Sequence, residues 1–152
     1  MTKSIQAALA LAATAMFASA CSEAPEQAEI APDAPSGIAL ANGRLMLPAV
    51  AGNPGAVYFD VSNSSDRNMV IRAVAVEGAG SAMMHNSDME EMSQVMIRPD
   101  ETVKFAPGEQ HVMAMDLADT VTAGGESEVT VTFVGGDKAS LPIEVRAAGD
   151  ER

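Results

Sequence analysis

Hydrophobic and polar residues alternate with a period of two over many short segments of this chain. Val57, Phe59 and Val61 fall on one side of such a segment, and the same pattern runs from Val129 to Phe133. This alternation is typical of half-buried β-strands. Because glycine, proline, asparagine and aspartate separate the segments, we predict an all-β fold, an antiparallel β-sandwich or barrel.

Nine segments are predicted to be strands, and no stretch beyond residue 37 keeps a helical period for more than two turns. The predicted strands are residues 38–47, 55–63, 69–77, 82–85, 94–97, 102–105, 110–117, 128–134 and 141–146. Turn-forming residues at 63–66 and 135–137 separate neighbouring strands. Together they predict one β domain over residues 37–148, followed by a short tail at 149–152.

The N-terminus has the organisation of a secretory signal over residues 1–20. Lys3 precedes an apolar stretch that ends near Phe17 and is too short for a typical membrane span, and small residues follow. Cys21 comes next, and Ala-Ser-Ala-Cys resembles the bacterial lipobox, although Ala18 stands where leucine is more usual. We predict lipidation of Cys21 as the first mature residue. Ordinary cleavage after Ala20, giving a soluble secreted protein, fits the same residues.

Residues 22–36 contain three prolines and four acidic residues. Such a segment cannot bury enough apolar surface to order itself, so we predict a flexible linker. Ser22, directly after the cysteine, is the residue type that accompanies sorting to the outer membrane in Gram-negative lipoproteins. We therefore predict a periplasmic protein whose only membrane attachment is a lipid anchor, with the outer membrane favoured.

Composition excludes several classes of function. The 152 residues carry a formal net charge of −12, which disfavours nucleic-acid partners because phosphate binding needs a basic surface. A single cysteine excludes an internal disulfide and any metal site built from several thiolates. The sequence also has no recognisable nucleophile motif, so we do not expect an enzyme.

Methionine is the residue type that stands out. Seven of the eleven methionines lie in residues 83–96 and 111–115, and each of these patches contains one of the chain's two histidines. In a strand, His111, Met113 and Met115 would line one face while Val112 and Ala114 pack inward.

Imidazole and thioether groups on one face form a soft donor set, which favours Cu(I) over Zn(II) or Mg(II). Thioethers form no disulfides, so they suit the oxidising compartment that the signal sequence predicts. The alternative interpretation is that these methionines only fill the hydrophobic core.

The spacing of the histidines and methionines along the chain resembles that of a known family. His85 and Met96 have ten residues between them, and His111-Val112-Met113 is a His-x-Met motif. The chain resembles the PCuAC family of periplasmic copper chaperones, whose motif is His, ten residues, Met, twenty-one residues, then His-x-Met. Residues 51–58, the Arg-Pro at 98–99 and the segment 105–108 also resemble that family. The resemblance covers about residues 37–147.

One spacing departs from the family. Met96 and His111 have only fourteen residues between them, which we interpret as a shortened hairpin after residue 99. Met89, with twenty-one residues before His111, is an alternative ligand to Met96. Met84, Met92 and Met115 complete the set of auxiliary donors to consider.

The resemblance implies a cupredoxin-like β-sandwich with Cu(I) bound at one end by His85, Met96, His111 and Met113. It also implies delivery of copper to the copper centre of a haem–copper (cytochrome c) oxidase, directly or through another copper chaperone. A second hypothesis is copper sequestration, with Met83, Met84, Met89 and Met92 as extra weak donors. A third is a β-sandwich interaction module that binds no metal and uses its methionine-rich end as an adaptable apolar surface.

Overall fold

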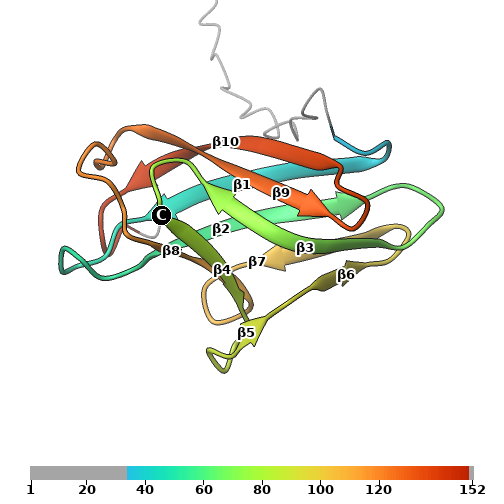
Figure 1. Ribbon diagram of the computed structural model, residues 1–152, viewed down its shortest axis with the longest axis horizontal. Helices are drawn as coiled ribbons and strands as arrows, with labels where there is room; N and C mark the ends of the chain where they lie inside the picture. Colours follow the sequence, from blue (N-terminus) through green and yellow to red (C-terminus); the bar gives the residue numbers. More distant parts are fainter. Residues whose placement is uncertain (1–33, 151–152) are drawn as a thin grey trace, which may run out of the picture.

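The computed structural model describes residues 34–150, which form ten β-strands joined by turns (Figure 1). The strands are β1 (Ile38–Met46), β2 (Gly55–Asn63), β3 (Met69–Val76), β4 (Ser81–His85), β5 (Glu91–Met92), β6 (Val95–Ile97), β7 (Glu101–Phe105), β8 (His111–Met115), β9 (Glu126–Phe133) and β10 (Lys138–Arg146). The prediction of an all-β fold is confirmed. No helix with the length and apolar character of a membrane span occurs in residues 34–150.

Several predictions concern residues outside this range. Outside the described residues lie the signal sequence at 1–20 and the lipidation site Cys21. The linker at 22–36 is described only in its last three residues, and the tail at 149–152 only in its first two.

All ten strands belong to one curled sheet. Its order is β5-β4-β8-β2-β1-β10-β9-β3-β6, and β7 makes an additional pair with β2. Only Ser93 and Gln94 separate β5 from β6 along the chain, so the two outermost strands of this order must lie near each other. Figure 1 shows β3 and β9 in front of β1 and β2, so the curled sheet forms two layers.

The alternation seen in the sequence becomes the packing of the core. Val57, Phe59 and Val61 of β2 and the matching residues of β9 are buried between the layers. Phe59 stacks on Phe105 of β7 with ring centroids 4.6 Å apart. Burying these side chains supplies the main stabilisation of the sheet, and it leaves the opposite side of β2 and its neighbours free to carry polar groups.

One strand pair differs from the antiparallel prediction. β1 and β10 pair in parallel, with Arg44 opposite Glu144 and Met46 opposite Arg146. The remaining pairs are antiparallel. Alternation shows which side of a strand is buried, but it contains no information on strand order or direction.

A bulge in β1 lies beside this parallel pair. The register with β2 shifts between Ala41 and Arg44. Two residues of β1, Asn42 and Gly43, therefore lie opposite a single residue of β2. A Cβ atom on Gly43 would overlap the side chains of Leu141 and Ile143 on β10, so glycine is required for the close approach of these strands.

The predicted strand ends differ from the observed ones by at most three residues. β5 was not predicted, because two residues are too few to show a period. The prediction of a hairpin after residue 99 is also wrong, because the strands on either side of residue 99 do not pair with each other. A tight turn is present there, with the Glu101 amide donating to the Arg98 carbonyl at 3.2 Å. However, β6 pairs with β3 and β7 pairs with β2, so this turn connects two different parts of the sheet.

Candidate metal centre

The two histidines lie opposite each other on paired strands. β4 and β8 pair in antiparallel fashion, with His85 opposite His111 and Met83 opposite Met113. The two imidazole rings meet edge to face, with centroids 6.1 Å apart. Strands remote in sequence thus bring two imidazoles and two thioethers onto one patch of the sheet.

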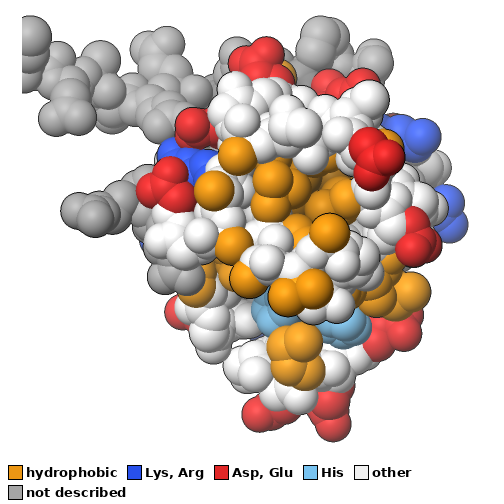
Figure 2. All heavy atoms as spheres, turned by 90° about the vertical axis from the view of Figure 1, so that its left-hand side faces the viewer, with side chains coloured by type: hydrophobic (Ala, Val, Ile, Leu, Met, Phe, Trp, Pro, Cys, Tyr) orange, Lys and Arg blue, Asp and Glu red, His pale blue; other side chains and the backbone are white. Residues whose placement is uncertain are grey.

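Alternation along both strands places these side chains on the outer face. Met84 on β4 and Val112 and Ala114 on β8 are buried in the core, so their neighbours in sequence point outward. His111, Met113 and Met115 are all partly exposed, as their spacing predicted. Figure 2 shows the histidines on the surface between hydrophobic side chains, with acidic side chains at the rim.

The environment of His111 selects one tautomer. Its Nδ1 lies 3.0 Å from the backbone carbonyl oxygen of Glu109. Because a carbonyl oxygen can only accept, Nδ1 carries the proton and donates it, and Nε2 keeps its lone pair. Such a second hydrogen bond, which fixes ring and tautomer, is usual for metal-binding histidines. Tyr58 of β2 lies next to this ring, with centroids 6.5 Å apart.

His85 has an unsatisfied nitrogen. Its Nδ1 is buried and has no hydrogen-bond partner among the described residues. A buried polar atom without a partner is unfavourable, by about 1–3 kcal/mol, and such atoms in folded proteins usually have an explanation. A cation coordinated by the Nδ1 lone pair of His85 would give this buried nitrogen a partner. The residues present therefore fit a metal ion.

Met96 reaches the same end of the molecule by another route. It lies on β6, pairs with Val70 of β3 and is 52% exposed. It lines an open hollow together with Asn86 and Gln110, the residues next to the two histidines in the sequence. Met96 therefore shares this hollow with residues that flank the two histidines, but its strand pairs with β3 and not with β4 or β8.

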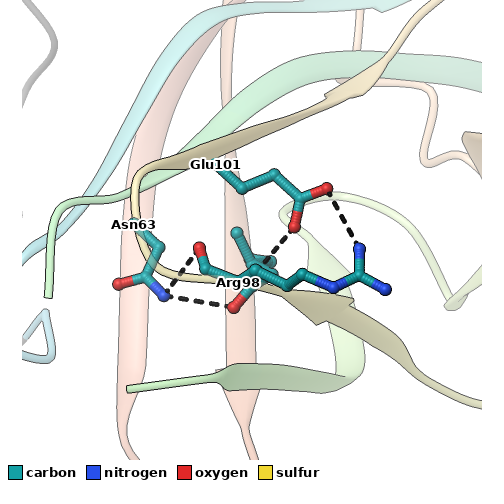
Figure 3. A network of polar contacts seen from close by, with 4 residues as sticks. Asn63, Arg98 and Glu101 are labelled. Carbon is teal, nitrogen blue, oxygen red and sulfur yellow. Dashed lines mark hydrogen bonds and ion pairs between the residues drawn. The ribbon is translucent and has the colours of Figure 1, made fainter. Parts of the chain in front are cut away.

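The turn that follows Met96 is held by a buried side chain (Figure 3). Asn63, at the end of β2, donates from Nδ2 to the carbonyl oxygens of Ile97 and Arg98 at 3.1 and 3.2 Å. Glu101 accepts a hydrogen bond from the Arg98 amide at 2.6 Å and forms an ion pair with its guanidinium. These contacts fix the end of β6 to the rest of the sheet.

The remaining methionines divide into different environments. Met84 is only 3% exposed and packs in the core, opposite the partly buried Met92 on β5. Met89 is 57% exposed in the loop between β4 and β5. Met83 shares the outer face with His85, although the sequence analysis named it only as an extra weak donor for sequestration. The i, i+2 spacing of Met83 and His85, applied to the first patch as it was to the second, would have placed both on one face.

The donor set limits the metals that could bind. Among residues 34–150, no three His, Cys, Asp or Glu side chains come together in a metal-binding cluster. The histidine pair shares its outer face with the thioethers of Met83, Met113 and Met115. Such a set suits a soft, singly charged ion, because thioethers are neutral and polarisable.

Residues 38–145 match the model of the family described as LpqE-like lipoproteins. The chain belongs to the LpqE-like family. No curated protein matches this LpqE-like chain in sequence.

Solved structures similar to this LpqE-like domain include several PCuAC domains. The copper-bound PCuAC domain from PmoF2 matches with a TM-score of 0.65 and 23% identity, over 73% of this chain and 93% of that domain. The apo PCuAC domain from PmoF1 matches with a TM-score of 0.65 and 24% identity, over 73% and 94%. The Cu(I) form of DR1885 from Deinococcus radiodurans matches with a TM-score of 0.62 and 19% identity, over 83% and 85%. This likeness confirms the predicted cupredoxin-like fold.

Proposed function

We propose that this chain is an extracytoplasmic copper carrier that binds Cu(I) as cargo at the face formed by β4 and β8. The observation that carries the proposal is the register that sets His85 against His111 and Met83 against Met113. The unsatisfied Nδ1 of His85 and the fixed tautomer of His111 support metal binding at this patch. Two solved domains of the same fold are described as copper-bound and Cu(I)-bound, which supports copper as the ion.

The chemistry of the patch favours a carrier over a permanent cofactor site. Its candidate ligands, His85, Met96, His111 and Met113, are all neutral, and at least part of each side chain reaches the surface. Without a thiolate ligand, the set differs from that of a blue-copper electron-transfer site. Neutral ligands at the surface can release the ion to a partner by exchanging one donor at a time.

Titration with Cu(I) under anaerobic conditions, against a competing chromophoric ligand, tests this function. We expect one tight equivalent for the full chain, which His85→Ala and His111→Ala each abolish. Met96→Leu should weaken binding while Met89→Leu leaves it unchanged, and this pair of variants decides between the two candidate methionines. Wild-type protein that binds no Cu(I) would reject the proposal and leave the metal-free interaction module.

We also propose where the carrier acts. The name of the LpqE-like family supports a lipid anchor at Cys21, and this anchor would hold the domain at the periplasmic side of a membrane, with the outer membrane favoured. The resemblance to PCuAC domains supports transfer of copper to the copper centre of a cytochrome c oxidase, directly or through another chaperone. Copper sequestration is the competing function, and it predicts several weak equivalents instead of one tight one.

A further inference from the structure

Three thioethers lie side by side on the outer face, next to the histidine pair. Met83 on β4 lies directly opposite Met113 on β8, and Met115 follows two residues later on the same face. Met83 is 36% exposed, whereas its neighbour Met84 is 3% exposed. We call Met83, Met113 and Met115 the methionine trio.

The register places these side chains within reach of a single ion. Directly opposed residues in an antiparallel pair have Cβ atoms about 4.5–5.5 Å apart, and alternate residues along a strand are about 7 Å apart. Methionine has three rotatable side-chain bonds, so sulfur atoms that start from these positions can converge on one point. Rotation of these side chains would bring the three sulfur atoms to a cation that lies above the sheet.

Two residues that lie directly opposite the trio on neighbouring strands have small side chains. Ser81 lies opposite Met115 on β4, and Ala56 of β2 lies opposite Met113 on its other side. Both are small residues, so neither of them covers the thioethers. Core packing does not explain Met83 either, because its exposed side chain would be expected to be buried if it filled a gap.

We propose that the methionine trio is a second binding position for a soft monovalent cation, Cu(I) or Ag(I), which uses sulfur ligands alone. This inference rests on the proposed function in one respect, because the trio and the proposed histidine site share Met113. A shared ligand lets copper pass between the two positions by exchanging one donor at a time, without dissociating into solution. The trio would then serve as the place where copper enters or leaves the carrier.

Silver titration separates the two positions, because Ag(I) has the same preference for sulfur and does not change its oxidation state. The full chain and the variant His85→Ala/His111→Ala would be titrated with Ag(I) and examined by native mass spectrometry and calorimetry. We expect one tight equivalent for the wild type, because the shared Met113 lets only one position fill at a time, and one weaker equivalent for the double variant. Adding Met83→Leu to the double variant should abolish this remaining equivalent.

Matched controls make these outcomes decisive. Met83→Leu keeps the size of an exposed side chain, so its circular dichroism and unfolding midpoint should match those of the parent protein. Met89→Leu in the double variant removes an equally exposed thioether from a loop and should leave the equivalent in place. X-ray absorption of the Cu(I)-loaded double variant should show sulfur ligands only.

Two results would overturn the inference: a double variant that binds no Ag(I), or binding that Met83→Leu leaves unaltered. Failure of the proposed function gives a different result, in which the wild-type chain lacks its tight Cu(I) equivalent.

Discussion

At the scale of single residues, Tyr58 offers a direct signal of ion binding. It is the only tyrosine in a chain without tryptophan, and its ring lies 6.5 Å from that of His111. We expect Ag(I) or Cu(I) bound to His111 to reduce tyrosine fluorescence, and the effect should saturate at the first equivalent. The emission of His111→Ala should stay constant through the same titration. Equal loss of emission in both proteins would place the ion elsewhere.

The arrangement around Tyr58 also explains its position. The bulge in β1 turns Arg44 to the outer face, where its guanidinium carbon lies 4.9 Å from the centroid of the tyrosine ring. This cation–π contact holds the ring beside His111. The sequence contained no sign of it, because the contact depends on a register shift between strands.

Local spacing predicted one half of the candidate site and not the other. The shared face of His111, Met113 and Met115 follows from alternation within a single strand, and the structure has it. The pairing of His85 with His111 depends on the register of β4 against β8, which residue spacing alone does not determine. The position of Met83 opposite Met113 depends on the same register, so spacing alone predicted Met83 only as an extra weak donor.

At the scale of elements, the end of β6 depends on Asn63. This side chain is 1% exposed, and its amide donates to three backbone carbonyls, two of them in the turn after Met96. We expect Asn63→Ala to lower the free energy of unfolding by about 2–4 kcal/mol, because buried carbonyl oxygens lose their donor. Cu(I) affinity should fall as well, since Met96 loses its fixed position. Chemical denaturation and the Cu(I) competition titration measure the two effects.

Arg98→Ala is the matched control in the same network (Figure 3). The Arg98 side chain is 71% exposed and its ion pair with Glu101 spans 3.7 Å, so this change should affect stability by less than about 1 kcal/mol. Equal destabilisation by the two variants would mean that Asn63 does not anchor the turn. The sequence predicted turn residues at 63–66, but it gave no indication that Asn63 also holds a second, distant turn.

At the scale of the whole molecule, attachment and copper delivery can be tested together. A bacterial strain that lacks the gene should lose oxidase activity when copper is scarce, and the wild-type gene should restore it. The wild-type protein should be recovered with the membrane fraction, whereas Cys21→Ser should be soluble. Unchanged oxidase activity in low copper, combined with poor growth in high copper, would favour sequestration over delivery.

Strand order is the part of the whole-molecule architecture that the sequence could not supply. Nine of the ten strands were predicted, because each has its own alternation of buried and exposed residues. The position of β10 between β1 and β9 results from contacts between the two ends of the domain. The alternation within β1, β9 or β10 does not indicate which strands become neighbours.

The parallel pair of β1 and β10 has a consequence for the time at which the domain can fold. The ribosome makes β10 after the other nine strands of residues 34–150, yet this strand lies between β1 and β9 and joins them into one sheet. A growing chain that lacks residues 138–146 has two unpaired strand edges, and contacts between distant residues form slowly. The domain therefore cannot fold completely before residues 138–146 have been made. Under the export that we propose above, the polypeptide would cross the membrane before this sheet is complete, and the face that carries the two histidines would form only on the far side.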